Sequence, residues 1–105
     1  MITLDVLVVP HCPHRAAADR ALRRAATAAG LTGTRIDVTV VKSDRQARTT
    51  GFAGSPTFRI GGRDPFAEPG QPPGLSCRLY RTPAGLRPIP HQPALIEAIR
   101  HATAA

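Results

Sequence analysis

The order of apolar and polar residues along the chain predicts alternating strands and helices. Residues 2–9 alternate and then run apolar up to Pro10, a pattern typical of a central strand. Between Pro13 and Gly30 the apolar residues recur at helical spacing, with arginines around the other side. This segment is a predicted helix of about four turns that ends at Gly30.

The rest of the chain shows the same two patterns. Three segments with alternating or strand-like apolar residues are predicted strands: residues 34–41, 57–60 and 75–81. Two segments are predicted helices, a short exposed one capped by Ser43 and a last one with an apolar side: residues 43–50 and 93–102. Prolines and glycines crowd residues 63–74, which are a predicted loop.

These elements follow the order β-α-β-α-β-β-α, which predicts the α/β class. The helix between the first two strands requires those strands to be parallel, whereas the loop between the last two is compatible with an antiparallel pair. We therefore expect a four-stranded mixed sheet with helices on both faces. The length of 105 residues fits a single domain, residues 1–105.

Composition bears on the compartment. No run of about 18 apolar residues is present, so we expect no segment that spans a membrane. The first residues carry no basic segment, and Asp5 interrupts their apolar run, which argues against a signal peptide. The expected compartment is the cytoplasm.

The formal net charge of +7 raises the question of nucleic-acid binding. All of the basic side chains except Lys42 are arginines, and they are scattered from Arg15 to Arg100 without a basic tail. Scattered charge supports only weak, salt-sensitive contact with phosphates. We therefore do not expect nucleic acid to be the partner.

Cys12 stands where the first strand gives way to the predicted helix. Pro13 suits the first helical position, which would make Cys12 the N-cap residue. Its sulfur would then lie near the backbone N–H groups of His14 and Arg15, and the helix dipole would favour the thiolate. Three interpretations stay open: a reactive thiol tuned by His14 and Arg15, a soft-metal ligand together with His11 and His14, or a cysteine without chemistry.

The second cysteine, Cys77, lies in the predicted strand 75–81, in phase with Leu75 and Leu79. Its apolar neighbours favour a buried cysteine that fills the core. An alternative role is to resolve a disulfide formed at Cys12, which requires the two Cα atoms to lie within about 7 Å.

The element order, the sequence "CPHR" that begins at Cys12 and the sequence "GSPT" before the third strand together resemble the thioredoxin superfamily. The resemblance covers nearly the whole chain and implies a thioredoxin-like fold. It implies that Pro56 follows a cis peptide bond and lies against the cysteine site. It also implies that Ser55 and Thr57, on either side of this proline, are substrate-binding positions.

The phrases "GFAGSPTFRIGGRDPF" and "GLSCRLYRT" are further similar to a branch of small bacterial proteins, many with a single site cysteine. Arg15 replaces the second cysteine of the usual Cys-x-x-Cys site. The resemblance therefore implies a monothiol that exchanges disulfides through Cys12 with a protein or a low-molecular-weight thiol, without a cofactor. A second thiol, either a small cellular one or Cys77, must then release the mixed disulfide.

Two alternatives accompany this expectation. Some members of the branch are described as alkylmercury-lyase-like, which points to an organomercurial-binding or metal-binding protein that uses Cys12 and Cys77. Cleavage of a carbon–mercury bond would need an acid near both cysteines; the acid considered, Asp64, is expected to cap a turn. The other alternative is a binding module of the same fold without catalysis.

Overall fold

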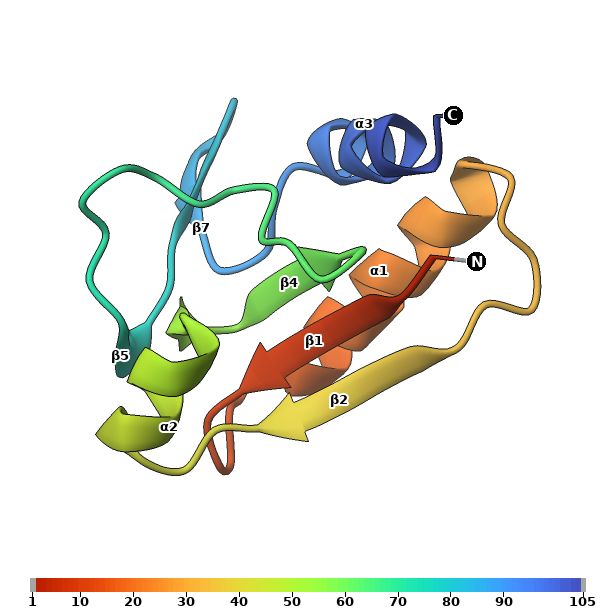
Figure 1. Cartoon of the computed structure of the whole chain (residues 1–105). Helices are drawn as coiled ribbons and strands as arrows, with labels where there is room; N and C mark the ends of the chain where they lie inside the picture. Colours follow the sequence, from red (N-terminus) through yellow and green to blue (C-terminus); the bar gives the residue numbers. More distant parts are fainter. Residues whose placement is uncertain (1, 105) are drawn as a thin grey trace.

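The centre of the protein is a sheet in which parallel and antiparallel pairing meet on one strand. In the computed structural model, which describes residues 2–104, β1 (Leu4–Val8) pairs in parallel with β2 (Ile36–Val40). The helix α1 (Arg15–Ala28) crosses between them, as predicted (Figure 1). The other edge of β1 pairs antiparallel with β4 (Thr57–Ile60). The sheet is therefore mixed, in the order β2-β1-β4, and the fold is mixed α/β.

The strand β1 is central because buried apolar side chains lie on both of its faces. Leu4, Val6 and Val8 are buried in a large cluster with α1 and α3 (Gln92–Thr103). Leu7 points to the opposite face and belongs to a second, smaller cluster. A strand that is buried on both faces needs cover on each side of the sheet.

The helices α1 and α3 pack against each other and cover one face of the sheet (Figure 1). The buried side of α1 consists mostly of alanines, which let the helix lie close to the strands: Ala18, Ala21, Leu22, Ala25 and Ala26. Leu95 and Ile99 of α3 are fully buried, and each contributes about 2 kcal/mol by leaving water. The side-chain amide of Gln92 donates to the Ala21 carbonyl at 3.3 Å, which joins the two helices at one end.

The helix α2 (Asp44–Thr50) lies on the opposite face, at one end of the sheet (Figure 1). Ser43 caps it, as predicted, because its hydroxyl accepts a hydrogen bond from the Gln46 N–H at 3.1 Å. Gly51 ends it in the left-handed conformation, with φ of 69°. The helix covers the smaller cluster: Leu7, Val41, Ala47 and Phe52.

The strand predicted over residues 75–81 does not join the sheet, which has three strands within the described part of the chain. Instead, β5 (Gly74–Cys77) pairs in parallel with the short β3 (Ala53–Ser55). A separate two-stranded ribbon, the β6–β7 ribbon, consists of β6 (Tyr80–Thr82) and β7 (Gly85–Arg87). The prediction of a four-stranded sheet was wrong.

The reason lies in which side chains of this segment enter the interior. Arg78 is 3% and Tyr80 4% exposed, whereas Leu79 is 54% exposed. Arg78 and Tyr80 are therefore the side chains that enter the interior, whereas the prediction placed Leu79 there. A buried guanidinium needs polar partners, and Arg78 finds them in the loop after β4 rather than along the sheet. Cys77 is exposed, so the prediction that it fills the core was also wrong.

The helices of the protein are short. The longest, α1, has 14 residues, and α3 has 12. Across residues 2–104 there is no helix whose length and apolar character would allow it to cross a bilayer.

Candidate functional site

The chain makes a tight turn between β1 and α1, and this turn carries Cys12. The Cys12 N–H donates to the Val9 carbonyl at 3.3 Å, and the Arg15 N–H donates to the Cys12 carbonyl, also at 3.3 Å. His11 has a φ of 60°, in the left-handed region that few residues other than glycine adopt. Cys12 is a free thiol, half-buried against the larger cluster. We call residues 9–15 the Cys12 turn.

The helix α1 begins later than predicted. His14, not Cys12, is its N-cap residue, and no side chain makes a capping hydrogen bond there. The hydrogen bond from Arg15 to the Cys12 carbonyl closes a turn around Pro13, so the proline lies in that turn rather than in the first helical position. The expectation that Cys12 caps the helix was wrong by two residues.

The N-terminal end of α1 nevertheless carries an uncompensated positive potential. Its first turn contains no acidic residue. Within the described residues, the backbone N–H groups of Ala16 and Ala17 have no hydrogen-bond acceptor. Free amide groups and the helix dipole favour a negative charge nearby, and Cys12 precedes them in the adjoining turn.

The Ser55–Pro56–Thr57 segment lies at the same end of β1. Thr57 is in register with Leu7, near the carboxyl end of that strand. The Val9 N–H donates to the Ser55 hydroxyl at 3.0 Å, so Val9, the first residue of the Cys12 turn, joins the turn to this segment. The Ser55–Pro56 peptide bond is cis, which agrees with the expectation.

The polar groups on both sides of Pro56 are already occupied. The side chains of Ser55 and Thr57 are buried, and the Ser55 carbonyl accepts from the Arg78 N–H at 3.0 Å. Ser55 is also in register with Cys77 of β5. The strand β5 therefore lies along the backbone beside Ser55, a residue that the resemblance made a substrate-binding position.

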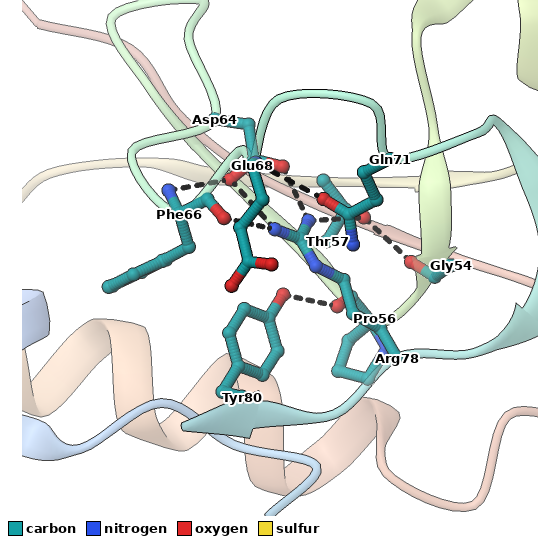
Figure 2. Close-up of polar contacts among 9 residues, drawn as sticks. All are labelled: Gly54, Pro56, Thr57, Asp64, Phe66, Glu68, Gln71, Arg78 and Tyr80. Atoms are coloured by element: carbon teal, nitrogen blue, oxygen red, sulfur yellow. Dashed lines mark hydrogen bonds and ion pairs between the residues drawn. The ribbon is translucent and has the colours of Figure 1, made fainter. Parts of the chain in front are cut away.

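A buried arginine holds this segment and the following loop together (Figure 2). The Arg78 guanidinium forms an ion pair with Asp64 and donates to the Thr57 hydroxyl at 3.2 Å and the Phe66 carbonyl at 2.9 Å. It also lies 4.7 Å from the centre of the Tyr80 ring. We call these residues, with Pro56, the Arg78 network.

Tyr80 and Thr57 complete the network around the proline (Figure 2). The Tyr80 hydroxyl donates to the Pro56 carbonyl at 2.5 Å, and the Thr57 hydroxyl donates to the Gly54 carbonyl at 2.6 Å. Burial raises the pKa of the Tyr80 hydroxyl above its ordinary value, so this hydroxyl stays protonated and remains a donor. Within the described residues, no buried side-chain polar atom lacks a hydrogen-bond partner.

The close approach of β5 to the proline segment depends on Gly54. Its φ is 118°, and a Cβ atom there would lie 3.0 Å from both the Arg78 Cβ and the Ser76 carbonyl oxygen. Any side chain at position 54 would therefore push β5 away from β3. The glycine in "GSPT" serves this contact.

The other residues predicted around Cys12 lie within the Cys12 turn and do not form a metal centre. His11 and Arg15 are exposed, and His14 is half-buried. Among residues 2–104 there is no group of three His, Cys, Asp or Glu side chains that could hold an ion. The soft-metal interpretation of His11, Cys12 and His14 therefore has no structural support.

The sequence interpretation singled out Pro56, Thr57 and Asp64 but missed the Arg78 network that joins them. Asp64 caps a turn, as predicted, because its carboxylate accepts from the Phe66 N–H at 2.8 Å. The available signal was the arginine inside a strand-like segment with several apolar residues, "LSCRLY".

Comparisons with known proteins found no match to this chain among family models, curated proteins or solved structures.

Proposed function

We propose that the protein is a thioredoxin-like monothiol protein that exchanges disulfides through Cys12. The observation that carries this proposal is the position of a half-buried thiol just before an uncapped helix end, in a turn that Val9 connects to the Ser55–Pro56–Thr57 segment. The attacking form in disulfide exchange is a thiolate, and the dipole of a helix favours an anion near its N-terminal end.

The reaction needs one disulfide and one further thiol. The Cys12 thiolate attacks one sulfur of the substrate disulfide, the sulfur–sulfur bond breaks, and the other half leaves as a thiolate. Arg15 cannot close the resulting mixed disulfide. A second thiol attacks the bound sulfur, forms a new disulfide with it and releases Cys12 as a thiolate.

The substrate we propose is a low-molecular-weight disulfide. An extended protein chain would have to pair with the backbone next to Pro56, but the Ser55 carbonyl already accepts from Arg78 and β5 lies alongside. A small disulfide needs only access to the sulfur of Cys12. The reduced thiol pool of the cytoplasm, the compartment expected from the sequence, would supply the releasing thiol.

The test compares the two cysteines one at a time. Cys77→Ser leaves Cys12 as the reporter, and Cys12→Ser leaves the exposed Cys77 as the matched control. We expect iodoacetamide to modify Cys12 about tenfold faster than Cys77 at neutral pH, and oxidised glutathione to form a mixed disulfide on Cys12 that free glutathione removes. Equal alkylation rates for the two cysteines, or no mixed disulfide at Cys12, would contradict the proposal and favour a binding module without catalysis.

The organomercurial alternative receives no specific support. Its acid would be Asp64, and the carboxylate of Asp64 is already engaged by Arg78 and by the Phe66 N–H. Both oxygens of this carboxylate accept from the Arg78 guanidinium. We therefore do not extend the proposal to cleavage of carbon–mercury bonds.

A further inference from the structure

The β6–β7 ribbon presents apolar side chains to solvent. Leu79, just before β6, is 54% exposed, and Leu86 of β7 is 53% exposed. Together with Arg81, which is in register with Leu86, they line a groove of about 480 Å³. Exposed leucines that gather beside a groove mark interaction surfaces more often than exposed leucines scattered singly. We call Leu79, Arg81 and Leu86 the leucine face.

The same ribbon also has an open edge. All three residues of β7 are exposed, and within the described residues β7 pairs with β6 alone. Figure 1 shows the ribbon standing out from the central sheet. An unpaired edge offers backbone N–H and C=O groups to an incoming strand. The Leu86 carbonyl accepts from the exposed Arg87 side chain, which an incoming strand would displace.

The charges around the ribbon are mainly positive. Arg87 follows Leu86 in β7, so it alternates to the face opposite the leucine face, and its guanidinium donates to the Leu86 carbonyl at 3.0 Å. Within the described residues it has no carboxylate partner. Arg81 forms an exposed ion pair with Glu68, and His91 lines the groove. The whole chain carries a net charge of +7. Like charges would oppose pairing with a second copy of the chain, whereas an acidic partner would be attracted.

We propose that the β6–β7 ribbon binds an extended, acidic segment of a partner protein, which adds as a strand to the open edge of β7. Successive side chains of a strand point to opposite faces, so a segment with alternating apolar and acidic residues fits both sides. Its apolar side chains cover the leucine face, and its carboxylates meet Arg87. This interaction does not depend on the chemistry proposed for Cys12.

The first experiment uses a synthetic peptide in which leucine and glutamate alternate, added to ¹⁵N-labelled protein. We expect amide shifts confined to residues 79–87 and slower hydrogen exchange at β7, as strand addition requires. A matched peptide with lysine in place of glutamate should bind at least about tenfold more weakly. Shifts elsewhere, no binding at about 1 mM peptide, or equal binding of both peptides would overturn the proposal.

Substitutions separate the two parts of the surface. Leu86→Ser and Arg87→Glu should each weaken the binding of the glutamate peptide by about tenfold. Arg45→Glu is the control, since Arg45 is also exposed but lies on α2 and makes the same change in net charge. Thermal melting shows whether each variant is folded. If Arg45→Glu weakens binding as much as Arg87→Glu does, or if Leu86→Ser is without effect, the proposed surface is wrong.

A membrane surface also attracts apolar and basic groups, and vesicles distinguish it from a protein segment. Vesicles of phosphatidylglycerol should bind the protein weakly and without dependence on Leu86. If they bind more tightly than the glutamate peptide and Leu86→Ser abolishes that binding, the partner is a lipid surface and the assignment to a protein segment fails.

Discussion

Arg78 brings a charged group into the interior of the protein, between the proline segment and the loop after β4. Its guanidinium has four acceptor contacts, on Thr57, Asp64 and Phe66, and an aromatic ring beside it. A buried ion pair is stable only when its hydrogen-bonding groups are satisfied in this way. The pair also holds Asp64, so removal of the arginine leaves a carboxylate largely shielded from water and without its partner.

We therefore predict that Arg78→Met lowers the free energy of unfolding by about 3 kcal/mol. Arg81→Met is the control, because the ion pair between Arg81 and Glu68 is exposed. Its loss should cost less than about 1 kcal/mol. Urea unfolding measures both values. Adding Asp64→Asn to Arg78→Met should recover part of the lost free energy of unfolding. Equal losses in Arg78→Met and Arg81→Met would contradict a special role for the buried pair.

Asp5 is a second residue whose surroundings affect stability. It lies between Asp37 of β2 and Arg59 of β4 in the sheet register. Burial and then the charge of Asp37 raise the pKa of its carboxyl, against an opposing effect of Arg59. The folded protein therefore binds this proton more tightly than the unfolded chain does. The ionised carboxylate of Asp5 destabilises the fold at neutral pH, and acidification through its folded-state pKa removes that cost.

Asp5→Asn removes the charge, so we predict a higher melting temperature than wild type at pH 7. The advantage should shrink as the pH falls and disappear below about pH 4, where the aspartate is protonated in both states. Thermal melting over this pH range provides the measurement. A stability difference that does not change with pH would mean that the ionisation of Asp5 is not its cause.

At the scale of elements, the N-terminal ends of α1 and α2 differ in whether a side chain caps them. Ser43 satisfies a backbone N–H at the start of α2, whereas α1 begins at His14 without any side-chain cap. The uncapped end is the one next to Cys12. A capped helix is more stable, but an uncapped one leaves its amide groups available to an anion.

A carboxylate at position 14 should compete with the Cys12 thiolate for this end. In the Cys77→Ser background, we predict that His14→Asp slows alkylation of Cys12 at neutral pH and stabilises the fold by about 0.5 kcal/mol. Thr27→Asp adds a carboxylate at the far end of α1 and should leave the alkylation rate within about twofold of its parent. A faster reaction in His14→Asp would show that the helix end does not favour the thiolate.

The sequence predicted the elements well where local chemistry alone decides them. Ser43 and Gly51 delimit α2, and the apolar run of β1 identified the central strand. The fourth strand failed because residues 75–81 alternate whichever face is buried, and only the long-range ion pair between Arg78 and Asp64 decides between the two. An alternating pattern does not show which set of alternate residues is buried when the polar side chains have partners far away in the sequence.

For the candidate site as well, the sequence predicted the local features but not the long-range contacts. The sequence placed Cys12 before the helix and singled out Pro56. It misplaced the helix start by two residues, because a hydrogen bond from Arg15 to the Cys12 carbonyl competes with the first helical turn. It could not foresee that β5 would occupy the backbone beside Ser55, since that pairing depends on the close approach allowed by Gly54.

At the scale of the whole molecule, positive charge is in excess and spread over the surface. Some of the fourteen basic side chains have an acidic neighbour, as in the exposed ion pairs Arg23–Asp19 and Arg35–Asp37, but basic residues outnumber acidic ones by seven. Mutual repulsion of exposed charges opposes the compact state, and salt screens it. Pairs of this exposed kind contribute little.

We predict that the urea midpoint rises when sodium chloride is increased from about 10 mM to about 150 mM, a range over which the screening length falls from about 30 Å to about 8 Å. The same titration with Arg78→Met should show the same rise, because the buried ion pair is shielded from salt. A fall in the midpoint would mean that the surface ion pairs outweigh the repulsion.

The double-sided burial of β1 has a consequence for how the protein comes apart. Leu4, Val6 and Val8 anchor one cluster and Leu7 the other, so the two apolar clusters share a single backbone. Neither cluster can unfold while the other one holds β1 in place. Both clusters should therefore unfold in one cooperative thermal transition. A destabilising substitution in the smaller cluster under α2 should also affect Cys12, which follows the shared strand.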